Sequence, residues 1–111
     1  MEALTTYTYA DGSGNRYHLH GHLLRYVPVQ PHQSSSGVYS GGAPWARELA
    51  PAAHAALAAA FEAALADTSA HQPDRGMGSG WVLAAGPSGE RQCILAMRSP
   101  TQQTLEQALG R

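Results

Sequence analysis

Three histidines at alternate positions form the first group of side chains that could do chemistry. His18, His20 and His22 lie in an extended stretch of the chain, and alternate residues of a strand point to one face, about 7 Å apart. Two imidazoles so placed can share a zinc or iron ion, whose open position could activate water. The alternative is a polar, solvent-facing strand surface, because no spaced Cys or Glu-rich motif accompanies the histidines.

A stretch rich in serine and glycine, residues 34–42, is the second candidate. Small residues let backbone N–H groups approach a ligand, and the start of a following helix favours negative charge. The stretch is not a P-loop, because the chain contains no lysine. We expect a small anionic ligand here, and the alternative is an ordinary Gly/Ser loop. The predicted ligand-binding residues are Ser36, Tyr39, Ser40, Gly41, Gly42 and Arg75.

Arg75 opens a second glycine-rich segment, residues 75–80. This segment precedes a predicted strand, whereas the dinucleotide-binding fingerprint follows a strand and opens a helix. The two glycine-rich loops begin at opposite ends of the long predicted helix described below. They can therefore form one pocket only if a loop folds back or if a second subunit brings its other end alongside.

Nucleophilic catalysis finds little support in the sequence. Cys93 lies in the middle of an apolar strand, where thiols are usually inert packing groups. His54 shares the apolar stripe of the long helix, where a histidine is more often a core residue than a base. No cofactor is expected. The sequence therefore favours a binding domain over an enzyme, and the alternative is a small metal-dependent or anion-binding enzyme.

These side chains must be positioned by the elements of one domain, residues 1–111. Residues 4–29 predict a β-hairpin around the turn at 11–15, and residues 81–97 predict a second hairpin around 86–89, with strands covered on both faces. Ser99 is a predicted N-cap for a short terminal helix. The expected fold is α+β, with ββαββα order and a four-stranded antiparallel sheet that has both helices packed on one face.

Residues 51–67 predict the principal helix, because eleven of the seventeen residues at 50–66 are alanine. Pro51 suits the first helical turn and disfavours helical geometry at Ala50. Pro44 is expected to open a short helical turn that runs to Leu49. The helix has an apolar stripe, and its opposite face carries no charge. That opposite face consists of Ala52, Ala56, Ala59 and Ala63. We expect the helix to be covered on both sides and the chain to form a homodimer.

Composition excludes several classes of protein. One cysteine precludes an internal disulfide framework. The seven arginines are dispersed and the net charge is −1, so nucleic-acid binding is not expected. No apolar run approaches the roughly 20 residues that span a bilayer, and the N-terminus has no secretory signal pattern. A cytoplasmic protein with no membrane partner is the expectation.

Overall fold

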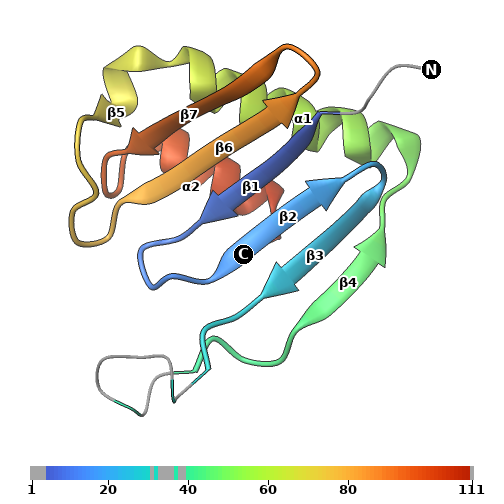
Figure 1. The fold of residues 1–111 in the computed structure, drawn as a ribbon, viewed down its shortest axis with the longest axis horizontal. Helices are drawn as coiled ribbons and strands as arrows, with labels where there is room; N and C mark the ends of the chain where they lie inside the picture. The colour runs from blue at the N-terminus through green and yellow to red at the C-terminus, as the bar shows by residue number, and fades with distance from the viewer. Residues whose placement is uncertain (1–4, 31, 33–36, 38–39, 111) are drawn as a thin grey trace.

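The computed structural model describes residues 5–30, 32, 37 and 40–110, and its framework is one antiparallel sheet of seven strands (Figure 1). In chain order the strands are β1 (Thr6–Ala10), β2 (Arg16–His20), β3 (Leu23–Val27), β4 (Trp45–Glu48), β5 (His71–Gln72), β6 (Gly80–Gly86) and β7 (Gly89–Leu95). Their order across the sheet is β4-β3-β2-β1-β6-β7-β5. Helix α1 (Pro51–Ala66) follows β4, and helix α2 (Pro100–Ala108) follows β7. The α+β class is confirmed, whereas four strands in ββαββα order is wrong.

Residues 4–29 were predicted to form one hairpin with two strands. They form three strands instead, β1, β2 and β3. The chain reverses at Gly21 and His22, so that His20 pairs with Leu23 across a two-residue turn. Gly21 has a φ of 58°, which suits glycine in a tight hairpin turn. Alternation fails in the sequence at Leu23 and Leu24 because a new strand starts there, with Leu24 in the core and Leu23 outside.

Residues 45–48 form strand β4 instead of the expected helical turn. β4 pairs with β3, and Leu23 lies opposite Glu48. The strand carries the chain back along the sheet edge from the loop before Trp45 to the start of α1 (Figure 1). The described part of that loop therefore lies at the opposite end of the sheet from the N-terminus of α1.

The second hairpin is confirmed, with Gly86 paired to Gly89 around a two-residue turn. The prediction that its strands are covered on both faces is wrong. On β6, Val82 and Ala84 are buried under the helices, whereas Trp81 and Leu83 on the other face are only half-buried. That uncovered sheet surface is called the open face below.

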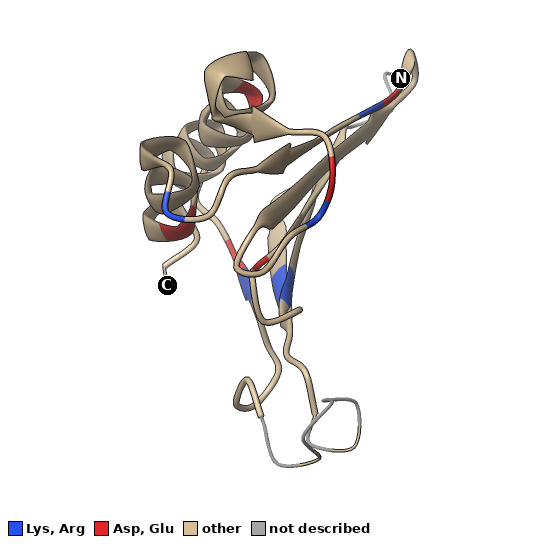
Figure 2. Ribbon diagram, turned by 90° about the vertical axis from the view of Figure 1, so that its left-hand side faces the viewer, with Lys and Arg blue, Asp and Glu red and all other residues tan. Residues whose placement is uncertain are grey.

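Both helices cover one face of the sheet, as Figure 2 shows from the side. α1 starts after an extended Ala50 (φ −62°, ψ 155°), so the predicted break at this residue is confirmed. Phe61 of α1 is fully buried and stacks on Tyr7 of β1, with ring centroids 4.9 Å apart. The predicted cap of α2 is also present, since the Ser99 side chain accepts a hydrogen bond from the Gln102 N–H.

The outer face of α1 is exposed in the single chain, so the described residues provide the predicted cover on one side of the helix only. The exposed residues are Ala52, Ala56, Ala59 and Ala63. A methyl side chain exposes little apolar area, and alanine forms helix without needing burial. No helix in the described part of the chain is long and apolar enough to cross a membrane.

Candidate functional site

The turn between β1 and β2 is built around a buried carboxylate. Asp11 is 1% exposed, and its Oδ1 accepts the N–H groups of Ser13 (2.9 Å) and Asn15 (3.0 Å). Its Oδ2 accepts the Asn15 side-chain amide at 3.1 Å. The side-chain Oδ1 of Asn15 accepts the N–H of Val29 at 2.8 Å. These charge-assisted bonds hold the turn, residues 11–15, in one conformation.

Both glycine-rich loops contact this turn. A Cβ added to Gly41 would overlap the side chain of Asn15, and one added to Gly12 would lie 2.6 Å from Cα of Gly78. Only glycine permits these approaches. The two loops therefore meet at one end of the sheet within a single chain. The expectation that they start at opposite ends was wrong because it omitted β4, which spans that distance.

Arg75 lies at this end of the sheet, beside a concavity on the open face. Its Nη2 donates to the backbone carbonyl oxygen of Asp11 at 3.0 Å, and its Nη1 donates to that of Ala10 at 3.4 Å. The concavity has a volume of about 390 Å³. Its lining residues are Ala10, Gly14, Arg16, Arg75, Trp81 and Ile94.

Three more predicted ligand-binding residues fall in the described part of the chain, and Ser40, Gly41 and Gly42 do not line this concavity. Gly41 accepts the Tyr26 hydroxyl on its carbonyl oxygen at 2.6 Å, so its backbone fastens the loop to β3. The N–H of Gly42 donates to the Ser40 hydroxyl at 3.2 Å, a local turn contact. The other two predicted residues, Ser36 and Tyr39, lie outside the described residues. Of the four predicted ligand-binding residues that the structure describes, Arg75 alone lines the concavity.

The three histidines do not share one strand face. His18 and His20 alternate on β2, but His22 lies in the turn after it, where its ring centroid is 4.5 Å from that of His54. The His18 Nδ1 lies 3.1 Å from the Thr8 hydroxyl. Partial burial, followed by the positive charges of flanking arginines, lowers the pKa of His18. Among the described residues, no group of three or more His, Cys, Asp or Glu is placed to hold a metal ion.

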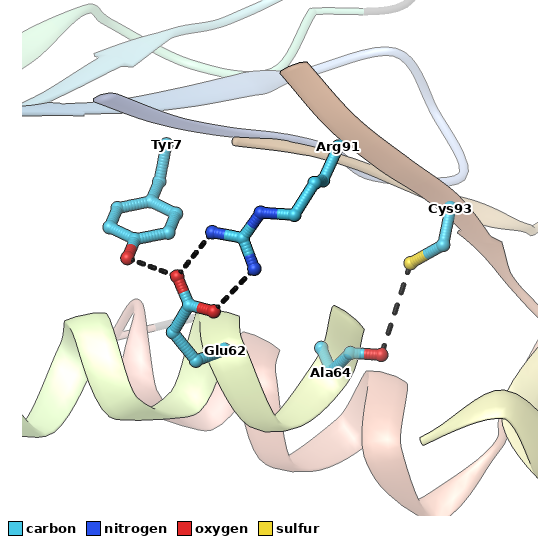
Figure 3. A network of polar contacts seen from close by, with 5 residues as sticks. All are labelled: Tyr7, Glu62, Ala64, Arg91 and Cys93. Atoms are coloured by element: carbon cyan, nitrogen blue, oxygen red, sulfur yellow. Dashed lines mark hydrogen bonds and ion pairs between the residues drawn. The ribbon is translucent and has the colours of Figure 1, made fainter. Parts of the chain in front are cut away.

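A polar network on the helix-covered face joins α1 to the sheet (Figure 3). Arg91 donates to both carboxylate oxygens of Glu62 at 2.7 and 2.8 Å, and the Tyr7 hydroxyl donates to Oε2 at 2.5 Å. The hydrogen bonds from Arg91, and to a smaller extent the one from Tyr7, lower the pKa of Glu62 to about 2. Burial, followed by the hydrogen bond to Glu62, raises the pKa of Tyr7 to about 12. Burial also raises the pKa of Cys93 to about 11, so its thiol stays protonated near neutral pH. The network fastens the helix and offers no activated nucleophile.

Glu62→Gln is expected to lower stability by on the order of 1 kcal/mol near pH 7, a modest value because the Glu62 side chain is 42% exposed. The folded-state pKa is depressed, so the carboxylate contributes fully above its ordinary pKa of about 4.5 and loses the contribution as pH falls towards about 2. Urea unfolding at a series of pH values checks this. The difference in unfolding free energy between wild type and Glu62→Gln should shrink as the pH is lowered. Glu90→Gln, which removes an exposed β7 carboxylate outside the network, is the control. A gap that is constant with pH contradicts it.

Arg16, Trp81 and Ile94 were not identified from the sequence as site residues. The sequence does show that Arg16 and Trp81 each follow a glycine-containing turn. A turn does not reveal which residues of β1, β2 and β6 lie opposite one another, so the sequence could not bring these side chains together. Comparison of this chain with protein-family models, with curated proteins and with solved structures finds no match.

Proposed function

We propose that this domain acts by association, as a homodimer formed through the outer face of α1. The observation that carries the proposal is the contrast between the two sides of that helix. Leu57, Phe61 and Ala64 are buried against the sheet, while the opposite face exposes an uninterrupted row of small apolar side chains. Those side chains are Ala52, Ala56, Ala59 and Ala63.

The charges on α1 favour packing of this face against another apolar surface. Within the helix only Glu62 is acidic, and Arg91 of β7 neutralises it on the sheet side. A second helix can therefore pack on the four alanines without desolvating an unpaired charge within α1. Alanine faces also permit the shortest helix–helix separations, near 8 Å between axes.

A groove beside the alanine face adds room for the partner helix. It lies between α1 and α2 and has a volume of about 240 Å³. Its lining residues are Ala60, Ala63, Ala64, Asp67, Pro100, Thr101 and Thr104. Two copies related by a twofold axis would lay their α1 helices antiparallel, so that each helix meets the same surface on the other copy.

Ala59→Glu and Ala63→Glu are each expected to weaken the dimer at least tenfold, because either carboxylate would be buried without a partner. Sedimentation velocity over a concentration series measures the dissociation constant. Gln107→Glu adds the same charge at an exposed position of α2 and should leave association unchanged. A wild-type protein that sediments as an 11.7 kDa monomer at every concentration would sink the proposal.

Binding of a small anionic ligand is a second candidate function, favoured by the position of Arg75 beside the open-face concavity. The proposed role of residues 34–42 as a binding loop stays a prediction. Ser40, Gly41 and Gly42 make local or β3 contacts, and the concavity is the better supported place for an anion.

A further inference from the structure

The open-face concavity is built by four adjacent strands, and it lies on the side of the sheet away from both helices. We propose that it binds a small molecule that carries a flat aromatic ring and one carboxylate or phosphate group. The site does not involve the outer face of α1, so this proposal stands or falls independently of the homodimer.

Strand register explains why a hollow exists here. Ala10 of β1 pairs with Arg16 of β2 on one side and with Trp81 of β6 on the other. Trp81 in turn pairs with Ile94 of β7. Paired residues in antiparallel strands point to the same face, so these four side chains form one row. The methyl group of Ala10 is much shorter than its neighbours and is only 5% exposed, and the side chains of Arg16 and Trp81 line the hollow beside it.

The depression carries two guanidinium groups, those of Arg16 and Arg75. Arg75 reaches it from the loop after β5 and donates to the carbonyl oxygens of Ala10 and Asp11, which bear no formal charge. The single ion pair among the described residues joins α1 to β7, so neither Arg16 nor Arg75 is paired with an acid there. A guanidinium has five N–H donors, and two of those of Arg75 form hydrogen bonds to backbone carbonyl oxygens. The remaining donors are available to an anion.

Arg75 contacts the backbone of Asp11, whose side chain is directed into the turn. The carboxylate of Asp11 is 1% exposed and accepts the N–H groups of Ser13 and Asn15 inside the turn. The two hydrogen bonds of Arg75 go to backbone carbonyl oxygens, those of Ala10 and Asp11.

Trp81 supplies a flat apolar wall that is held in place. Its indole Nε1 donates to the side-chain carbonyl of Gln92 at 3.0 Å, which fixes the ring orientation. The guanidinium carbon of Arg16 lies 5.9 Å from the ring centroid, so charge and ring are adjacent. Aromatic ligands stack on such a surface, and Ile94 extends it with an aliphatic side chain.

Size and chemistry together define the ligand class. Guanidinium groups bind carboxylates and phosphates through paired N–H donors. A volume of about 390 Å³ falls in the range of small-molecule sites, roughly 300–1,000 Å³. One or two fused rings with a single acidic group would contact the indole and a guanidinium together.

Calorimetric titration of the whole chain with 1-naphthoate and with 1-naphthyl phosphate tests the proposal. Saturable binding of at least one of these anions is expected, and whichever binds identifies the acidic group. Neutral 1-naphthamide and inorganic phosphate should each bind at least tenfold more weakly. In ¹⁵N-resolved NMR spectra the indole N–H signal of Trp81 should move on binding, while that of Trp45, on the edge strand β4, should not.

Substitutions assign the effect to the concavity. Arg16→Gln and Arg75→Gln are each expected to weaken binding at least tenfold. Arg25→Gln, on the open face of β3 but outside the concavity, should change the affinity less than twofold. Arg16 is exposed, so its variant tests the site even if Arg75→Gln disturbs the turn. No saturable binding of either anion at millimolar concentration, equal binding of the amide, or an unaffected Arg16→Gln variant would overturn the proposal.

Discussion

Replacing Phe61 with alanine is expected to remove about 3–5 kcal/mol from the free energy of unfolding, a large part of what a small domain possesses. Phe61 is fully buried between α1 and the sheet, and its ring stacks on Tyr7 with 18° between the planes. Truncation loses this contact and leaves a cavity that neighbouring backbone can only partly fill. Urea unfolding followed by circular dichroism measures the loss.

Phe61→Leu is the matched control, because it keeps most of the buried volume and should cost less than about 1.5 kcal/mol. The alanine variant should also lose self-association if that depends on α1 being docked on the sheet. A Phe61→Ala protein within 1 kcal/mol of wild type would mean that α1 does not pack on β1 through this residue.

Replacing Asp11 with alanine is expected to cost about 2–4 kcal/mol. The buried carboxylate accepts backbone N–H groups of Ser13 and Asn15 and the Asn15 side-chain amide. Removing it leaves buried donors unsatisfied, which costs about 1–3 kcal/mol for a typical group. The turn also presents the Asp11 carbonyl oxygen to Arg75. Affinity for an aromatic anion should therefore fall in the same variant.

Asp11→Asn separates the contribution of hydrogen bonding from that of the negative charge, because the amide keeps one acceptor oxygen and carries no charge. Its loss of stability should be clearly smaller than that of Asp11→Ala under the same denaturation conditions. Ser88→Ala, at an exposed site in the turn between β6 and β7, provides a surface control. Equal stability of Asp11→Ala and wild type would show that the turn is held by other contacts.

Association and ligand binding occupy opposite sides of this molecule in our proposals. The outer face of α1 lies on the helix layer, whereas Arg16 and Trp81 lie on the open face of the sheet. A dimer through α1 would leave both concavities accessible to solvent. Measuring naphthoate or naphthyl phosphate binding to Ala59→Glu alongside wild type would therefore show whether the two functions are independent.

Local signals determined the parts of the fold that depend on neighbouring residues. Pro51 and the alanine-rich run were enough to define α1 and its start after Ala50. Ser99 and Pro100 were enough to define the start of α2. The turn before Gly89 was equally clear. In each case the stabilising contact joins residues at most four positions apart, so the residue types decide the outcome.

Long-range pairing decided the rest. The sequence around Gly21 is compatible with a bulge or bend within a single strand. The pairing of β3 with β2 and β4 shows a hairpin turn there instead, and this turn removes His22 from the row of histidines. β4 is too short to have its own periodic signal and exists because β3 offers it an edge. The sequence by itself determined an α+β domain, an alanine-faced helix and a basic residue in the second glycine loop. The tertiary structure alone brought Arg16, Trp81 and Arg75 around Ala10, because strand register is set by contacts between segments far apart in the chain.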